Sequence, residues 1–223
     1  GFPIMLNTKD PAAIINTALM VQPGLGGVNL EDIAQPKCFY ILDTLREKAE
    51  IPMWHDDQQG TATVILAALM NALKVIGKKK ENVRIAFIGA GASNIACSRL
   101  IFRWGVEPSI CHMVDINGML GKHRKDYEMR KAEFKDAWKY CNITNADARE
   151  GGIPEALKDA DVAICFSQSG PGIVQPEWIK TMAKDPIVFA CANPIPEIWP
   201  WEAQEAGAAV IATGRSDFPN QVN

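Results

Sequence analysis

The sequence predicts an α/β protein built around a doubly wound parallel sheet, preceded by the end of a smaller α/β domain. From residue 83 onward, short apolar runs typical of buried strands alternate with helical patterns, which indicates a parallel sheet with right-handed crossovers. The stretch from Val83 to Asp115 reads as strand, glycine turn, helix, strand and acid. Polar residues follow several strands directly, at the end of the sheet where open α/β proteins bind ligands.

Residues 1–59 are expected to be the end of the smaller domain. Phe2–Leu6 is a short apolar run and is predicted to be a strand. A helix is expected to begin near Pro11, because proline is favoured in the first turn, and another near Pro36. Two short extended stretches, Val28–Leu30 and Ile51–Trp54, end next to acidic or polar residues.

Residues 60–223 are expected to form the sheet domain. A long apolar helix is predicted from Thr61 to about Val75, and its apolar run is judged too short to span a membrane. The charged segment Lys122–Lys139 is predicted to be one exposed helix. Three further buried strands are predicted at Ala160–Phe166, Pro186–Ala192 and Ala208–Thr213.

The glycine turn after the first strand of this domain indicates a dinucleotide site of the Rossmann type. Gly89 allows a tight turn, and Gly91 lacks a Cβ, so a pyrophosphate can approach the backbone at the helix N-terminus. Asp115 could accept hydrogen bonds from a ribose diol. Asn94 holds the place of the third glycine, which would set helix and strand slightly further apart; a purely structural turn is the alternative. The turn residues predicted to bind the cofactor are Gly89, Ala90, Gly91, Ala92, Ser93 and Asn94.

Three other residues at strand or helix ends are assigned to the cofactor. They are Thr61 at the start of the long helix, Ser167 after one strand and Asn193 after the next. Ligands of such sheets bind beyond the carboxyl ends of the strands. Asn193 also fits a substrate-facing amide, although an asparagine before a proline often simply closes a turn.

Two acidic pairs, Glu31–Asp32 and Asp56–Asp57, follow the short extended stretches of the first domain. If both stretches end at the same rim, four carboxylates converge, and like charges raise each other's pKa unless a cation lies among them. Carboxylate oxygens suit Mg²⁺ or Mn²⁺. The alternative is two solvated acidic turns, one of which caps the helix that begins near Gly60.

Two further side chains are ambiguous. His55 could be a ligand or a base, but a structural, hydrogen-bonded histidine is the simpler interpretation. Arg215 could bind a carboxylate or a phosphate, and a salt bridge to Asp217 or a neighbouring acid is the equal alternative.

The composition favours a globular enzyme or binding protein over several other classes. The chain has 223 residues, of which 48% are hydrophobic and 22% charged, with a net charge of −3. No basic block suggests nucleic acid as a partner, and no signal peptide or membrane span is expected. The six cysteines show no CxxC spacing, which favours core residues in a reducing cytoplasm. The chain lacks an initiating Met and stops in mid-pattern, so a longer protein is expected.

Five motifs together resemble the malic enzyme family in its shorter prokaryotic form, over nearly the whole chain. They are Gly26–Ile33, Trp54–Ala62, Gly89–Ala92, Ala192–Glu197 and Ala212–Asn223. The resemblance implies that malate is oxidised with NAD or NADP and decarboxylated to pyruvate and CO₂. It also implies a divalent metal, Mg²⁺ or Mn²⁺. A homo-oligomer is expected, although no residue pattern indicates its size.

By this resemblance, residues 1–59 are the end of the N-terminal malic-enzyme domain and carry the metal ligands Glu31, Asp32 and Asp57. Asp56 would pair with the catalytic lysine. Asn193 would contact malate and the nicotinamide, and Asn223 would be the first of an Asn-Asn pair at the substrate. The family's lysine base and tyrosine acid belong to an upstream segment that this chain does not contain.

Alternatives remain at this point. Asp115 disfavours the 2′-phosphate of NADP, yet Lys122, Arg124 and Lys125 follow and could neutralise one. The protein could also be a metal-assisted 2-hydroxy-acid dehydrogenase that does not decarboxylate, or a non-catalytic nucleotide-binding module.

Overall fold

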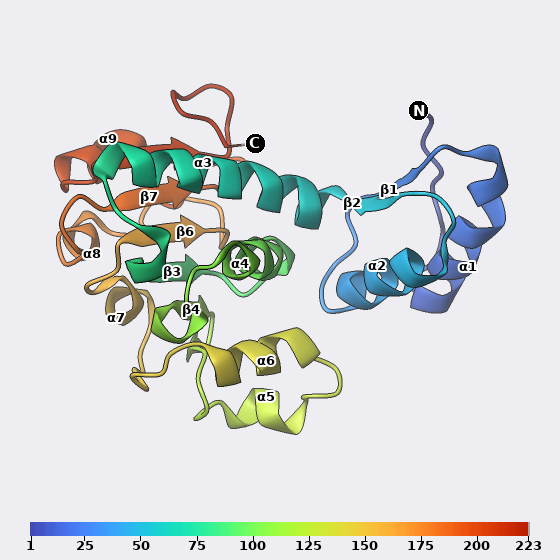
Figure 1. Cartoon of the computed structure of the whole chain (residues 1–223), viewed down its shortest axis with the longest axis horizontal. Helices are drawn as coiled ribbons and strands as arrows, with labels where there is room; N and C mark the ends of the chain where they lie inside the picture. The colour runs from blue at the N-terminus through green and yellow to red at the C-terminus, as the bar shows by residue number, and fades with distance from the viewer. Residues whose placement is uncertain (223) are drawn as a thin grey trace.

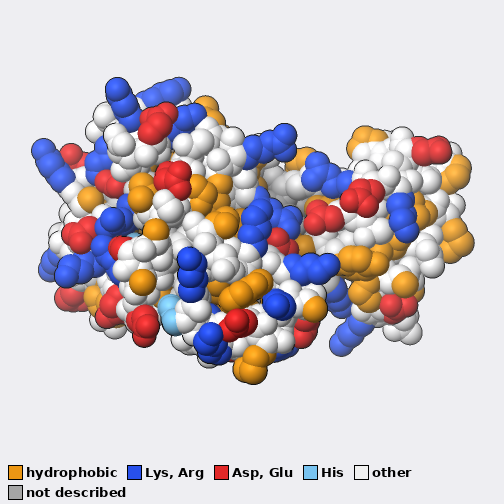
Figure 2. All heavy atoms as spheres, turned by 60° about the horizontal axis from the view of Figure 1, so that its bottom comes forward, with side chains coloured by type: hydrophobic (Ala, Val, Ile, Leu, Met, Phe, Trp, Pro, Cys, Tyr) orange, Lys and Arg blue, Asp and Glu red, His pale blue; other side chains and the backbone are white. Residues whose placement is uncertain are grey.

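The computed structural model describes residues 1–222, so the predicted substrate residue Asn223 lies outside the described residues. A smaller N-terminal lobe lies to one side of a larger α/β part, and the two are joined through the long helix α3 (Figure 1). Acidic and basic side chains are interspersed over the face that carries α5 and α6 (Figure 2).

The N-terminal lobe consists of two helices and a two-stranded parallel sheet. These are α1 (Pro11–Val21), β1 (Val28–Leu30), α2 (Lys37–Lys48) and β2 (Met53–His55), with the 3-10 turn η1 (Gln22–Gly24). The lobe has its own core, which includes Ile14, Ile15, Leu30, Ile41, Leu42, Leu45 and Met53.

The predicted strand at Phe2–Leu6 is wrong. These residues have no regular structure, and their apolar side chains are exposed. A strand needs a neighbouring chain to take up its backbone hydrogen bonds, and no strand in residues 1–222 pairs with this run.

The larger part contains a six-stranded sheet in the order β5-β4-β3-β6-β7-β8, in which only β5 is antiparallel. This confirms the doubly wound, mostly parallel sheet. The chain passes from β3 to β4 on one side and later returns to β6 on the other side of β3. The resulting switch point lies between β3 and β6, where such sheets bind ligands. The strands are β3 (Ile85–Ile88), β4 (His112–Asp115), β5 (Gly118–Met119), β6 (Val162–Cys165), β7 (Ile187–Ala190) and β8 (Val210–Thr213).

Helices cover both faces of this sheet, which explains why its central strands are apolar throughout. Alternate side chains such as Phe87 share a core with α3, α4 and α6, whereas their neighbours such as Ile88 share a second core with α7, α8 and α9. The helices of this part are α3 (Thr61–Ile76), α4 (Ala92–Trp104), α5 (Lys125–Met129), α6 (Lys135–Ile143), α7 (Ile153–Leu157), α8 (Pro176–Ile179) and α9 (Pro200–Glu205). Short 3-10 turns are η3 (Lys80–Asn82) and η4 (Pro108–Ile110).

The helix that leaves the N-terminal lobe is longer than predicted. A π-helical turn, η2 (Asp56–Gly60), continues into α3, and the combined 21 residues Asp56–Ile76 are long and apolar enough to cross a membrane by length and composition. The span includes η2, which the predicted helix from Thr61 to about Val75 does not contain. Ile65 and Leu69 are fully buried in the sheet core, and the apolar core helix of a globular protein meets the same criterion.

The predicted single helix at Lys122–Lys139 is also wrong. The segment forms α5 and the beginning of α6, and Arg124 before them is buried instead of exposed. Its guanidinium pairs with Asp115 and Asp126, so these partners replace water around it.

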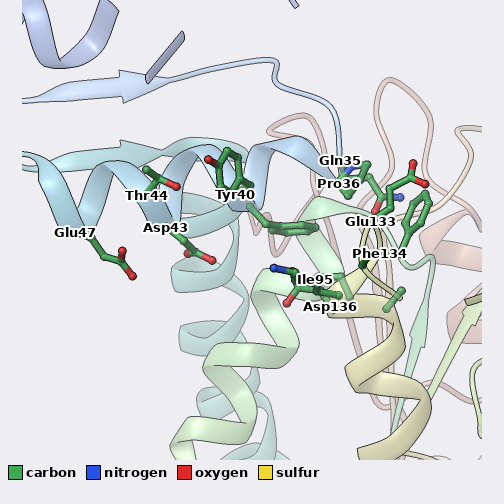
Figure 3. Close-up of a pocket in the computed structure, with 14 residues that line it drawn as sticks. Gln35, Pro36, Tyr40, Asp43, Thr44, Glu47, Ile95, Glu133, Phe134 and Asp136 are labelled. Atoms are coloured by element: carbon green, nitrogen blue, oxygen red, sulfur yellow. The ribbon is translucent and has the colours of Figure 1, made fainter. Parts of the chain in front are cut away.

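Side chains of helices α2 and α4 pack against each other where the N-terminal lobe meets the larger part. Cys38 and Phe39 of α2 enter the main core. Arg99 of α4 lies over the Phe39 ring and pairs with Asp136 at the start of α6, with Asp43 of α2 at 3.9 Å. A cavity of about 400 Å³ lies beside this contact, between α2 and the start of α6 (Figure 3).

His112 should make the folded protein less stable in acid. Its Nε2 lies 2.9 Å from Oδ1 of Asp147, and its buried Nδ1 has no partner in the described part of the chain. Burial lowers the pKa of His112, although Asp147 opposes this. Near pH 6.5 the imidazole of His112 is therefore protonated in the unfolded chain but still neutral in the folded chain. The free energy of unfolding decreases as the pH falls below about 6.5.

We expect the melting temperature to decline between about pH 7 and pH 5, and this decline to be smaller in His112→Gln, which keeps an N–H for Asp147. The exposed His123→Gln is the matched control and should melt like the parent. Equal pH slopes in His112→Gln and the parent would contradict the assignment.

Candidate functional site

A cleft of about 650 Å³ lies where the N-terminal lobe meets the carboxyl ends of the sheet strands. It brings together predicted residues from segments far apart in the sequence. These are Glu31, Asp56, Asp57, Thr61, Ser93, Ser167 and Asn193, with Gly60, Val64, Phe166, Cys191, Ala192, Gly214 and Val222 completing the wall. The cleft is thus next to the switch point of the sheet, where the fold favours a ligand.

The two glycines of the turn have different roles. Gly89 has φ +102, and a Cβ there would overlap the backbone carbonyl of Phe166, so the fold itself requires glycine. Gly91 has φ −83 and is the N-cap residue of α4, and a Cβ there would meet nothing within 4 Å. The backbone beside the α4 N-terminus is therefore open to an approaching anion.

Asn94 is a structural residue of the turn. Its side chain is fully buried, and its amide nitrogen donates to the carbonyls of Ile88 at 2.9 Å and Gly89 at 2.8 Å. It therefore holds the end of β3 against α4. Any influence of the Asn94 side chain on a cofactor acts through this backbone, because the side chain does not line the cleft.

Asp115 is already fully hydrogen-bonded. Arg124 donates to both of its oxygens at 2.9 and 2.8 Å, the Tyr127 hydroxyl donates at 2.8 Å, and the N–H of Asn117 donates at 2.8 Å. A carboxylate has about four lone-pair positions, so none remains free for a ribose diol in this arrangement. Burial opposes the charge on Arg124, but the hydrogen bonds and charges of Asp126 and Asp115 outweigh it and raise its pKa.

The acidic residues lie at the ends of β1 and β2, which are neighbours in one parallel sheet. Asp32 has φ +55, so the chain turns sharply after Glu31, and its N–H donates to Oδ2 of Asp57 at 3.2 Å. Ser93 at the start of α4 donates to the carbonyl of Asp57 at 3.1 Å. The acidic turn is therefore attached directly to the glycine turn.

His55 lies beside Asp57 at the end of β2. It is fully buried, and Gln58 lies 3.1 Å from its Nδ1. With Gln58 donating to Nδ1, the hydrogen of the neutral ring lies on Nε2, 3.5 Å from Oδ2 of Asp57. Burial lowers the pKa of His55 despite the nearby carboxylates. The structural interpretation of His55 is thus the one that its surroundings favour.

Asp56 and Asp57 both line the cleft. In a continuing strand, neighbouring side chains would point to opposite faces. Both aspartates belong to the π-helical turn η2, where the two-residue alternation of a strand no longer applies. Asp56 is exposed, accepts from Nε1 of Trp54 at 3.3 Å, and lies where a Cβ of Gly60 would be.

The acidic residues are of the type that binds a divalent cation, but their side chains are not arranged around a common point. Glu31 and Asp57 face the same cleft, and carboxylate oxygens are the ligands that Mg²⁺ and Mn²⁺ prefer. However, within residues 1–222 no three acidic, histidine or cysteine side chains are gathered as a ligand set. The Glu31 carboxylate accepts from the Asn29 amide at 2.7 Å, so side-chain rotations would have to close the site.

The loop after β7 contains Glu197, the last residue of the motif Ala192–Glu197, for which no role was predicted. Glu197 is fully buried, and its carboxylate accepts hydrogen bonds from Ser167 and Ala192. Burial raises its pKa, while these hydrogen bonds oppose the rise. Arg215 of the loop after β8 pairs with Asp217 and donates to the carbonyl of Pro194, so the salt-bridge alternative is the one present.

A family model described as "Malic enzyme, NAD binding domain" matches residues 58–221. The chain belongs to the malic enzyme family. The match contains the glycine turn and all six strands of the larger sheet, so the Rossmann-type fold is that of a malic enzyme.

Individual malic enzymes are similar over the whole chain. The bifunctional malic/malolactic enzyme of Bacillus subtilis is 46% identical over 100% of this chain and 52% of its own length. The NADP-dependent malic enzyme of Halomonas elongata is 42% identical over 99% of this chain and 50% of its length. The crystal structure of the Entamoeba histolytica malic enzyme has a TM-score of 0.95 and 50% identity, over 100% of this chain and 46% of that one.

The chain thus spans about half the length of the curated malic enzymes that it matches. The names of the matches mention both NAD and NADP. Similarity to malic enzymes therefore supports a nicotinamide dinucleotide as cofactor without choosing between the two.

Proposed function

We propose that the full-length protein oxidises malate with NAD or NADP and decarboxylates it to pyruvate and CO₂, with Mg²⁺ or Mn²⁺ bound. One observation supports this most strongly: a single cleft joins the acidic turn of the N-terminal lobe to the glycine turn and the strand ends of a malic-enzyme nucleotide domain. Such a cleft can hold a cation, a small hydroxy acid and a nicotinamide together.

In this reaction the hydroxyl-bearing carbon of malate loses a hydride to the nicotinamide, and the hydroxyl loses its proton to a base. The β-keto acid then breaks its bond to one carboxylate, CO₂ leaves, and the enolate takes a proton on carbon to become pyruvate. A divalent cation supplies charge stabilisation of the oxygen on which the enolate charge develops. We assign this cation to Glu31, Asp32 and Asp57.

The other residues of the cleft bind and orient the cofactor and malate. The open backbone at Gly91 and the free N–H groups of α4 suit the pyrophosphate. Ser167 and Asn193 lie at the ends of β6 and β7 and present a hydroxyl and an amide to the nicotinamide end and to malate. Asp56, exposed at the rim, is available to hold a lysine ammonium supplied by the upstream segment.

The test is a product analysis with the purified full-length protein, malate, each cofactor and Mn²⁺. Pyruvate, CO₂ and reduced cofactor should form in equal amounts. Accumulation of a stable keto acid with the reduced cofactor would indicate the non-decarboxylating dehydrogenase instead. Nucleotide binding without turnover would indicate the non-catalytic module. The cytoplasmic location and the homo-oligomeric state stay predictions.

Tyr127 gives a prediction about cofactor choice. Asp115 was expected to favour NAD over NADP, but its charge is paired with Arg124 and its lone pairs are occupied. We therefore expect weak discrimination in the parent. Tyr127→Phe removes one donor and frees a position for the 2′-hydroxyl of NAD, so the KM for NAD should fall by about two- to tenfold, the value of one hydrogen bond.

The KM for NADP should not fall in Tyr127→Phe, because a phosphate gains nothing from a free carboxylate lone pair. Steady-state kinetics with both cofactors measure this. An equal change for NAD and NADP would show that Asp115 does not contact the ribose.

A further inference from the structure

Several hydrogen bonds join the loops that follow β6 and β7. The Ser169 hydroxyl and the N–H of Gly170 both donate to the carbonyl of Ile195, and the N–H of Ile195 donates back to the Ser169 oxygen, all at 3.1 Å. The N–H of Val174 donates to the carbonyl of Glu197 at 3.1 Å. The two loops therefore behave as one piece at the end of the cleft.

The Glu197 carboxylate is the charged centre of this piece. Oε1 accepts from the N–H of Ser167 at 2.8 Å and from its hydroxyl at 3.1 Å, and Oε2 accepts from the N–H of Ala192 at 3.1 Å. The side chain is fully buried, and within residues 1–222 its partners are these neutral donors. Burying a carboxylate without a neighbouring cation costs folding free energy. Filling space in the core therefore does not account for a glutamate at this position.

The two residues that Glu197 holds are at the cleft. Ser167 itself lines the cleft, and the Ala192 N–H immediately precedes Asn193, which lines it as well. We propose that Glu197 is a positioning residue: by holding the ends of β6 and β7 together, it fixes the Ser167 hydroxyl and the Asn193 amide against the nicotinamide end of the cofactor. This inference rests on the proposed function, because that function supplies the nicotinamide.

A carboxylate suits this task better than an amide. Three donors converge on the two oxygens, and a carboxylate only accepts. A glutamine of the same shape can direct its oxygen to only one loop. Its oxygen would be retained by Ser167, which offers two donors, and its NH₂ group would then face the N–H of Ala192. Glu197→Gln should therefore release chiefly the β7 end, which carries Asn193.

The experiment compares Glu197→Gln with the parent in the full-length protein. Two ligands are titrated by calorimetry: NAD, and ADP-ribose, which has the pyrophosphate but no nicotinamide. We expect unchanged affinity for ADP-ribose, weaker affinity for NAD, and a kcat for malate lowered about ten- to a hundredfold, as small misplacements at a reacting centre do. Glu205→Gln, the same change at an exposed residue of α9, is the matched control and should behave like the parent.

A merely structural role would lower both affinities and kcat together, and this outcome would overturn the proposal, as would parent-like behaviour of Glu197→Gln. If that variant does not fold, Glu197→Asp takes its place, because it keeps the charge but shortens the reach to both loops, and the same pattern is expected. The binding comparison needs no turnover. If the parent does not turn over malate, the proposed function fails, while the difference between NAD and ADP-ribose still decides the role of Glu197.

Discussion

Gly91→Val should lower cofactor affinity by roughly a hundredfold or more, about 2.8 kcal/mol, while the protein stays folded. The backbone at Gly91 has φ −83 and ψ −175, which a β-branched residue adopts without strain, and nothing lies within 4 Å of the position its Cβ would take. The valine methyls would instead occupy the open space at the α4 N-terminus that we assign to the pyrophosphate.

Gly89→Ala is the informative control, two residues away. Here φ is +102 and the new Cβ would overlap the Phe166 carbonyl, so stability should fall by about 2–5 kcal/mol from backbone strain and overpacking. Thermal unfolding and calorimetric titration with NAD measure both effects in each variant. A Gly91→Val protein that binds NAD like the parent would remove the pyrophosphate from this turn.

The sheet could be predicted because its strands are apolar on both faces and the turn after β3 has a steric need for glycine. The predictions of secondary structure and burial were wrong where they depend on partners that are distant in the sequence. Phe2–Leu6 has strand composition but no neighbouring strand among the described residues. Arg124 looks like a surface charge until folding places Asp115 beside it.

The same limit applies to the candidate site. The acidic and glycine turns could be found from local patterns, because each follows an extended stretch directly. Local patterns could not show that Asp115 is saturated by donors up to 12 residues away, or that Asn94 serves the backbone. Glu197 ends the motif Ala192–Glu197, but the motif does not show what it contacts, since its partner Ser167 is 30 residues distant. A buried acid after an Asn-Pro turn becomes recognisable only once the strand order is known.

Asp57→Asn should weaken Mn²⁺ binding by at least about a hundredfold, whereas Asp56→Asn should change it by no more than about threefold. Asp57 lines the same cleft as Glu31, and its Oδ2 accepts from the N–H of Asp32 and lies 3.5 Å from Nε2 of His55. Removing one of three carboxylates leaves too little negative charge for a strongly hydrated cation. The asparagine oxygen can still accept from Asp32, so the fold of the turn should survive.

Asp56 differs although it lines the same cleft. Its carboxylate is exposed, accepts from Trp54 and lies over Gly60, and it takes no part in the hydrogen bond between Asp32 and Asp57. Asp56→Asn should therefore mainly lower kcat, by loss of the charge proposed to hold the upstream lysine, at nearly unchanged metal affinity. Titration of the full-length variants with Mn²⁺ separates the two aspartates. Equal losses of affinity, or a larger loss in Asp56→Asn, would reverse the assignment, and unchanged affinity in both would exclude a metal site at this turn.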